Sequence, residues 1–153
     1  MGINMEVKPI IKYWDNGNIK RKCWYINNNK FHRVDGPAYI CFYKSGEKEM
    51  EQWFLNDVRH REDGPTIVSY YKSGKIEEEE WFIDVTHRVE GPAYICYFES
   101  GETLRERWYI NDDELKDNEL IEYKEWLIDN NLAGKNYSTW TDEEKVLWRL
   151  RWK

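Results

Sequence analysis

The residues of this chain whose types could do chemistry recur as one unit: histidine, arginine, any residue, an acid, glycine and proline. The unit occurs three times, as His32-Arg33-Val34-Asp35-Gly36-Pro37, His60-Arg61-Glu62-Asp63-Gly64-Pro65 and His87-Arg88-Val89-Glu90-Gly91-Pro92. Histidine and acidic side chains are common metal ligands, and arginine binds phosphate and carboxylate groups. The unit could therefore form one of two kinds of site, a metal site or an anion-binding site.

The spacing of the unit argues against a metal site. If successive units occupy equivalent places in successive hairpins of one sheet, they lie about 9.6 Å apart, because neighbouring strands are about 4.8 Å apart. A zinc ion needs its ligand atoms about 2 Å away, so the three histidines cannot share one ion. The sequence also contains no metal-ligand spacing, no glycine-rich phosphate loop and no evident nucleophile. We expect no metal, no cofactor and no catalytic residues.

The repeated arginines have two interpretations. In the first, each arginine pairs with the acid of its own unit and organises a turn, and the histidine, acid, glycine and proline are structural turn residues. In the second, the arginines form a cationic rim for phosphate or carboxylate groups, including anionic lipid head groups. The residues of this alternative anion- or lipid-binding site are Lys20, Arg21, Lys22, Arg33, Arg61 and Arg88. We favour the structural turn.

The unit belongs to a longer internal repeat. A Ser-Gly pair follows each unit, with its glycine 14 residues after the histidine, and a tryptophan follows seven residues later; Gly17 and Trp24 form an earlier partial copy. Such pairs between aromatic and β-branched runs indicate hairpin turns. Asp-Gly-Pro suits the turn at the other end of each unit, because its glycine can take a positive φ and its proline can open a strand. Eight strands are predicted, near residues 8–14, 18–27, 37–43, 47–56, 65–72, 76–84, 92–98 and 102–111.

The C-terminal segment changes to a helical period. From about Asn118 the apolar residues form one arc, with Gly134 just past its end, and a second helix is predicted to open at Thr141 with Glu144 completing a capping box. We therefore predict a mainly β fold: an open antiparallel meander of about four β-hairpin repeats with a two-helix C-terminal cap. Residues 1–111 form the sheet and residues 112–153 form the cap, packed as one domain.

The tryptophans are the candidate partner-binding residues. Alternation along the strands places aromatic side chains on both faces, more than a lone sheet can cover. The candidates are Trp24, Trp53, Trp81, Trp108, Trp148 and Trp152. For the last two there is an alternative, in which the cap packs both of its helical stripes, Trp148 with Trp152 and Val146 with Leu147 and Leu150, against the last strand.

Charge is unevenly distributed. The 153 residues carry a net charge of −6, yet residues 1–33 hold seven basic and two acidic residues, a net +5, so the remainder carries −11. The acidic total disfavours general nucleic-acid binding. The basic run Lys20-Arg21-Lys22 falls where a later copy has four glutamates, residues 77–80, and this inversion raises the hypothesis of head-to-tail contact between chains.

The remaining composition bears on the compartment. The first residues lack the basic and apolar regions of a signal peptide, and no apolar run approaches the roughly 18 residues that a membrane helix needs. Three cysteines without a signal peptide indicate reduced, buried thiols. We expect an intracellular protein with no transmembrane segment.

The segments Trp-Phe-Leu-Asn, His-Arg-x-Asp-Gly-Pro and Tyr-Tyr-Lys-Ser-Gly resemble the variant MORN repeat (membrane occupation and recognition nexus) over roughly residues 10–111. They are similar to the His-Arg-x-Asp-Gly-Pro-Ala form found in proteins of large amoeba viruses and some phages. The resemblance implies an elongated sheet of consecutive hairpins used for protein interaction, self-association and, in some members, lipid contact. A viral source would place the chain in the host cytoplasm or the virion.

These observations together predict a non-enzymatic repeat scaffold for protein–protein interaction or self-association. The expected partner is another protein or a second copy of the chain. The alternative is a peripheral module that binds anionic membranes.

Overall fold

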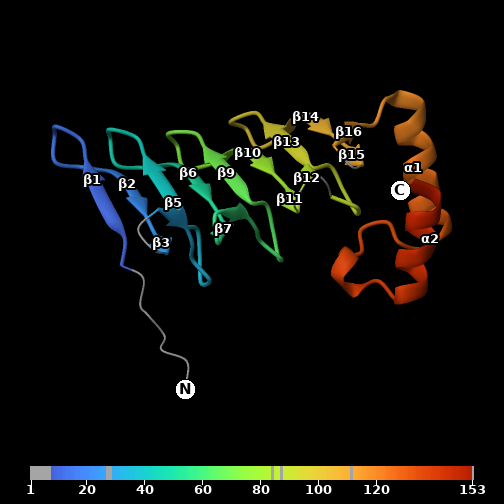
Figure 1. Cartoon of the computed structure of the whole chain (residues 1–153). Helices are drawn as coiled ribbons and strands as arrows, with labels where there is room; N and C mark the ends of the chain where they lie inside the picture. The colour runs from blue at the N-terminus through green and yellow to red at the C-terminus, as the bar shows by residue number, and fades with distance from the viewer. Residues whose placement is uncertain (1–7, 27–28, 84, 87, 111, 153) are drawn as a thin grey trace, which may run out of the picture.

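The computed structural model describes residues 8–26, 29–83, 85–86, 88–110 and 112–152, and it is mainly β with two helices at the C-terminal end (Figure 1). One antiparallel sheet holds eight strands in the order β1-β2-β5-β6-β9-β10-β13-β14. Their bounds are Ile10–Tyr13, Ile19–Cys23, Tyr39–Phe42, Lys48–Gln52, Ile67–Tyr70, Ile76–Glu80, Tyr94–Tyr97 and Thr103–Arg107. The predicted mainly β architecture, with its antiparallel sheet of hairpin strands and its two C-terminal helices, is confirmed.

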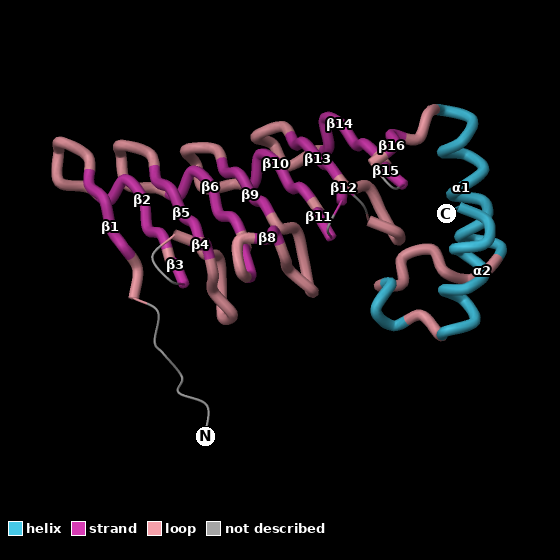
Figure 2. The backbone as a smooth tube through the Cα atoms, viewed as in Figure 1, coloured by secondary structure: helices cyan, strands magenta, loops and turns pink. Residues whose placement is uncertain are grey.

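The turns that close the four hairpins of this sheet share one geometry. Gly17, Gly46, Gly74 and Gly101 all have positive φ, between 82° and 113°, which only glycine adopts without strain. Each hairpin also carries one register shift near its turn. Such bulges increase the twist of a strand pair, and the sheet is correspondingly twisted in Figure 2.

The second strand of each hairpin is shorter than predicted. The sequence predicts one strand through each of Trp24, Trp53, Trp81 and Trp108, but the strand breaks at the tryptophan and a separate two-stranded hairpin follows. These short hairpins are β3–β4 (Tyr25–Ile26, Lys30–Phe31), β7–β8 (Phe54–Leu55, Val58–Arg59), β11–β12 (Phe82–Ile83, Val85–Thr86) and β15–β16 (Tyr109–Ile110, Asp113–Glu114).

The cause of the break is a change of hydrogen-bond partner at the tryptophan. The Trp24 N–H donates to the Ala38 carbonyl of the next hairpin (2.8 Å), whereas the Trp24 carbonyl accepts from the His32 N–H on its own side (3.0 Å). Trp53 makes the same two bonds, with Thr66 and His60. The residue thus links the large sheet to the short hairpin and belongs to neither.

The cap consists of α1 (Asp117–Asp129), a short 3-10 turn at Tyr137–Thr139 and α2 (Asp142–Trp152). The predicted capping box of α2 is confirmed, because the Thr141 N–H donates to Glu144 (2.6 Å) and the Glu144 N–H donates to the Thr141 hydroxyl (3.2 Å). The predicted stop at Gly134 is wrong: α1 ends at Asp129, and Asn131 takes the left-handed conformation with φ 56°. Asparagine tolerates that conformation better than most residues.

The helical stripes are also arranged differently from the prediction. The inner sides of the helices bury Tyr123, Leu127 and Trp148 in a cluster with Leu132 and Trp140. The single apolar arc predicted for the first helix is therefore divided, because Leu127 is buried while Ile121 and Ile128 are exposed. In α2 the Trp148 stripe is the inner one, and Val146, Leu147 and Leu150 of the second stripe are exposed. No described helix is long and apolar enough to cross a bilayer.

Candidate functional site

The three arginines of the repeated unit lie on tryptophan rings. The guanidinium carbon of Arg33 is 4.3 Å from the centroid of the Trp24 ring, and the distances are 4.1 Å for Arg61 on Trp53 and for Arg88 on Trp81. A guanidinium over an indole face is held by the negative charge density of the ring. The unit therefore builds one stack for each of the first three hairpins.

Hydrogen bonds and ion pairs hold each guanidinium in its stack. Its Nε lies next to the acid of the same unit: Arg33 to Asp35 (2.9 Å), Arg61 to Asp63 (3.1 Å) and Arg88 to Glu90 (3.5 Å). Its Nη1 donates to the carbonyl of the proline in the unit, at 3.3, 3.1 and 3.4 Å respectively. The Arg33 guanidinium also holds the pKa of the Asp35 carboxyl below its usual range. The predicted pairing of arginine with acid is confirmed.

The glycine of each unit has a different role from the one predicted. Gly36, Gly64 and Gly91 are not among the glycines with positive φ. A Cβ built on Gly64 would lie 2.7 Å from the Arg61 guanidinium carbon, and one on Gly36 or Gly91 would lie 3.0 Å from that of its arginine. The guanidinium is packed between the tryptophan ring and the backbone of this glycine. A side chain at the glycine position would therefore collide with the guanidinium.

This arrangement bears on the predicted cationic rim. Each of the three arginines is about three quarters buried and is already engaged by an indole, a carboxylate and a carbonyl. A groove of about 600 Å³ between the first two units is lined by Arg33, Arg61 and their acids, so its guanidinium groups are internally paired. Of the predicted anion site, Lys20, Arg21 and Lys22 are the residues outside these stacks.

The two histidines that the structure describes, His32 and His60, have different partners. His32 Nδ1 accepts a hydrogen bond from the Asn56 N–H (3.1 Å), which ties the first unit to the β7–β8 turn. His60 Nε2 is 3.8 Å from the Glu62 carboxylate, and His87 lies outside the described residues. Within the described ranges, no three histidine, cysteine or acidic side chains are grouped as metal ligands.

The six candidate tryptophans do not form one exposed surface. Trp24 is buried, and Trp53 and Trp81 are half-buried beneath their arginines. Trp108 and Trp152 pack against the cap cluster, and Trp148 within it is only 4% exposed. The structure therefore buries Trp24 and Trp148 and half-buries the other four rings. Of the alternative in which the cap packs both stripes, the Trp148 and Trp152 stripe packs against the cap cluster, whereas Val146, Leu147 and Leu150 are exposed.

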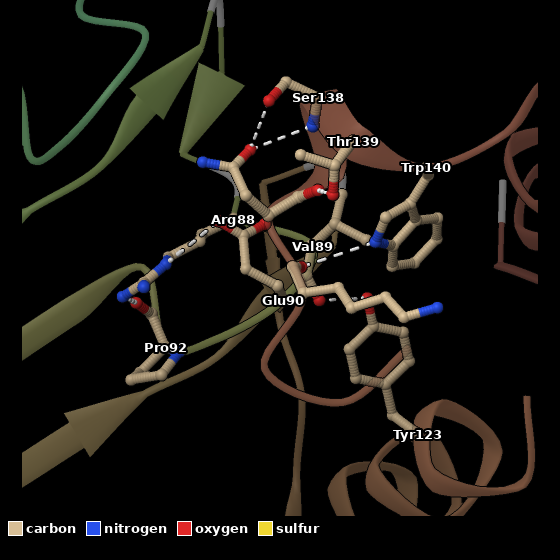
Figure 3. Close-up of polar contacts among 10 residues, drawn as sticks. Arg88, Val89, Glu90, Pro92, Tyr123, Ser138, Thr139 and Trp140 are labelled. Carbon is tan, nitrogen blue, oxygen red and sulfur yellow. Dashed lines mark hydrogen bonds and ion pairs between the residues drawn. The ribbon is translucent and has the colours of Figure 1, made fainter. Parts of the chain in front are cut away.

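A buried tyrosine bonds the cap to the third unit, and Val89 of that unit packs into the cap cluster. Figure 3 shows Tyr123 of α1 pointing at the loop of Arg88, Val89 and Glu90, where its hydroxyl donates to the Val89 carbonyl (2.7 Å). The same hydroxyl accepts from Trp148 Nε1 of α2 (3.0 Å), so one side chain joins both helices to the sheet. Val89 is 4% exposed, whereas Val34 at the same place in the first unit is 83% exposed. The cap therefore buries Val89, a position that is exposed where no cap covers it.

The two ends of the sheet have opposite character. We call β1 and β2 the basic end, because Lys12, Lys20, Arg21 and Lys22 lie there and no described carboxylate forms an ion pair with them. Lys20 instead lies over the Trp14 ring at 4.2 Å. The aliphatic outer side of α1 and α2, defined above by its five exposed residues, forms the other end. We call it the cap outer side.

A ladder of side-chain donors connects neighbouring hairpins near the turns. The residue three positions before the turn glycine donates to a carbonyl of the next hairpin: Trp14 to Phe42 (3.1 Å), Tyr43 to Tyr70 (2.7 Å) and Tyr71 to Tyr97 (2.6 Å). In the last hairpin the equivalent residue is Phe98, which has no donor and is 47% exposed. The ladder therefore ends where the sheet ends, at β14.

Two glutamates of the acidic run on β10 accept hydrogen bonds from tyrosines of the neighbouring strand β13. The Tyr94 hydroxyl donates to Glu78 (2.8 Å) and the Tyr97 hydroxyl donates to Glu79 (2.7 Å). Burial and this hydrogen bond raise the pKa of Tyr97. Burial raises the pKa of Glu80 as well, the Glu78 charge raises it further, and only Arg59 opposes the shift.

We expect Glu80→Gln to stabilise the fold at neutral pH, by about 0.5 kcal/mol after allowance for solvent screening. A carboxyl whose pKa is higher in the folded state costs stability when both states are ionised, and that cost disappears as the pH falls towards the unfolded value of about 4.3. Urea unfolding should thus show the gain at pH 7.5 and lose it near pH 4, with exposed Glu99→Gln as the neutral control. A Glu80→Gln variant less stable than the parent at pH 7.5 would contradict this.

The cysteines lie on the sheet as free thiols. Cys23 is buried and Cys41 and Cys96 are half-buried, so the prediction of buried cysteines holds fully for Cys23 alone. The register sets Cys23 opposite Tyr39 and Cys41 opposite Arg21. Burial, with the nearby Glu49 charge, raises the pKa of the Cys41 thiol to about 11, which keeps it protonated and unreactive at neutral pH.

Sequence reasoning missed the two features that distinguish the ends of the molecule. Tyr123 carries no special spacing, and only its place between Leu120 and Leu127 marks it as an inner residue. The outward direction of Leu147 and Leu150 could have been found from their position opposite Trp148 and Trp152 on a helical wheel. No family model, curated protein or solved structure matches the chain, so the arguments below rest on its own residues.

Proposed function

We propose that this chain is a non-enzymatic scaffold, in which one continuous sheet holds two unlike contact surfaces and binds other proteins through them. The observation that carries the proposal is the cap outer side. Its five aliphatic side chains are exposed, and Leu150 is 80% exposed, although the helices already bury a full aromatic cluster on their inner sides. Large exposed aliphatic residues concentrated in one part of a chain, here the two helices of the cap, are typical of protein-binding surfaces.

The position of the two surfaces supports the scaffold interpretation. The basic end and the cap lie at opposite ends of the sheet (Figure 1). Seven strand intervals between β1 and β14 span about 34 Å. The stacked arginines between them are committed to the fold, so the sheet acts as a spacer between its ends.

The experiment that tests this function removes the apolar character of the cap outer side. In Leu147→Glu/Leu150→Glu both exposed leucines become charged while the inner rings are kept, and exposed Lys44→Glu on a hairpin turn is the control. If the partner is a second copy, the mass measured by light scattering should rise with concentration for the parent and for the control. The mass of the double variant should stay that of one chain.

If the parent is a monomer at every concentration, cross-linking in extracts of the producing cells decides between the outcomes. We then expect a protein that cross-links to the parent and to the control and that is lost with the double variant. Identical cross-links for all three chains, together with an unchanged mass, would contradict the proposal.

An anionic membrane is the second candidate partner, and one observation favours it. Exposed Ile10, Ile11 and Tyr13 of β1 lie beside Lys12 and Lys20, a combination that suits a lipid head-group region. The arginines of the repeated unit contribute little here, because each is paired in its stack. The basic end alone would carry lipid contact.

A further inference from the structure

We propose that the basic end binds an acidic, extended segment of a protein partner, which adds to the sheet as a ninth strand along β1. This inference rests on the proposed scaffold function and names the chemistry of one of its partners. The first observation is that β1 is an edge strand. Among the strands that the structure describes, it pairs only with β2, and all four of its residues are exposed.

The second observation is what the equivalent strands have on that side. β5, β9 and β13 correspond to β1 in their hairpins, and each is paired on its outer edge with the last strand of the preceding hairpin. The register of this pairing is the same each time: Arg21 faces Cys41, Met50 faces Ser69 and Glu78 faces Cys96. The place equivalent to Cys41, Ser69 and Cys96 on β1 is Lys12, and no strand among the described residues faces it on that side.

The third observation is charge. A strand added in the same register sets one residue opposite Lys12 and the next two opposite Ile11 and Ile10. Lys12 itself faces Arg21 across β1 and β2, so two cations lie in one row with no described carboxylate between them. Opposite charges directly across a strand pair stabilise the pair, and like charges destabilise it. The added strand should therefore be acidic, as β10 is before β13.

A second copy of the chain is a poor occupant of this edge. Its free strand β14 would set Arg105 opposite Lys12 in the register of the internal strands, which brings like charges together. Such a contact would also lack the side-chain hydrogen bond that joins neighbouring hairpins. Trp14, Tyr43 and Tyr71 donate this bond within the sheet, but the equivalent residue of the last hairpin is Phe98, which has no donor. Pairing of β1 with another β1 would likewise gather the basic residues of both copies.

The test uses the full chain and a labelled synthetic peptide with the sequence of residues 74–82, Gly-Lys-Ile-Glu-Glu-Glu-Glu-Trp-Phe, which includes the acidic strand that lies before β13. Fluorescence anisotropy should show binding that weakens as salt is added. The counterpart with all four glutamates replaced by lysine should not bind. Equal binding of the two peptides, or binding of neither, would overturn the proposal.

Backbone-modified peptides distinguish strand addition from charge attraction alone. A strand uses the N–H groups of one edge for pairing, and alternate residues supply them. Two acidic peptides are therefore compared, one N-methylated at the odd-numbered residues and one at the even-numbered residues, so that each lacks the N–H groups of one edge. The peptide that lacks the N–H groups facing β1 should lose binding, and the other should keep it. Unchanged binding of both would overturn the strand.

Two matched variants place the contact. Lys12→Glu on β1 should weaken peptide binding about tenfold, which corresponds to about 1.4 kcal/mol. Arg105→Glu makes the same charge change on the exposed far edge, β14, and should leave the affinity within about twofold of the parent. Equal effects of the two variants would overturn the assignment to β1.

A vesicle arm separates this partner from a membrane. Salt-sensitive flotation with phosphatidylserine vesicles that is lost in Lys12→Glu, in a chain that binds no peptide, would assign the basic end to lipid and overturn the strand. The Leu147→Glu/Leu150→Glu variant should bind the peptide as the parent does. If the peptide does not bind, the strand proposal is wrong, but the scaffold function is still tested separately by the Leu147→Glu/Leu150→Glu experiment.

Discussion

Gly64→Ala is expected to lower the free energy of unfolding by about 2 kcal/mol, although it adds one methyl group on the surface of a loop. The new Cβ would lie 2.7 Å from the Arg61 guanidinium carbon, so the guanidinium must leave its place. Three interactions are then weakened together: the stack on Trp53, the contact with Asp63 and the bond to the Pro65 carbonyl. Urea unfolding followed by tryptophan fluorescence measures the loss.

A double-mutant cycle tests the cause. Arg61→Ala removes the side chain that the new methyl group would displace, so Gly64→Ala should cost less than about 0.5 kcal/mol in that background. Gly74→Ala is the contrasting case: nothing lies within 4 Å of its Cβ, and its cost comes from φ +82° alone, about 1 kcal/mol whether or not Arg61 is present. If the two Gly64→Ala costs are equal, the stack is not what the glycine protects.

Tyr123→Phe is expected to destabilise the chain by about 2 kcal/mol, the cost of withdrawing a buried hydroxyl that serves two partners. Tyr123 is 1% exposed, and its hydroxyl donates to the Val89 carbonyl and accepts from Trp148. The cap should separate from the third unit at lower urea concentration than the sheet unfolds. Hydrogen exchange of the α1 amides measures this separation directly.

Tyr137→Phe is the matched control for that experiment. Tyr137 also belongs to the cap and packs against Trp140 and Trp148, but its hydroxyl forms no hydrogen bond with any described residue. Its loss should change stability by less than about 0.5 kcal/mol. Similar effects of the two substitutions would show that ring packing, and not the Tyr123 hydroxyl, holds the cap.

The repeated part of the fold was predictable because its determinants are local. Glycine before a β-branched or aromatic run defines each turn, and the period of two defines each strand, so the hairpins and their antiparallel order followed from spacing. The break at each tryptophan did not follow. It depends on the bond from the Trp24 N–H to Ala38 in the next hairpin, and a pattern within one hairpin holds no information about that partner.

The candidate site was predictable only as far as residue types allowed. An arginine two residues before an acid indicated the ion pair that the structure contains. The guanidinium also lies on a tryptophan nine, eight or seven residues earlier in the chain. This contact depends on the path of the short hairpin between the two residues, which the spacing of the sequence does not specify. Burial of Trp148 and exposure of Leu150 likewise depended on which helix face meets the sheet.

The order of strands in the sheet has a consequence for how such a chain can change its size. In the described sheet each hairpin pairs only with the hairpins next to it in sequence, and consecutive turn glycines lie 29, 28 and 27 residues apart. Loss or duplication of one such segment in the gene would leave both ends of the molecule unchanged and alter their separation by about 9.6 Å. The distance between the two ends of the sheet is thus a quantity that can evolve in steps, independently of the residues at either end.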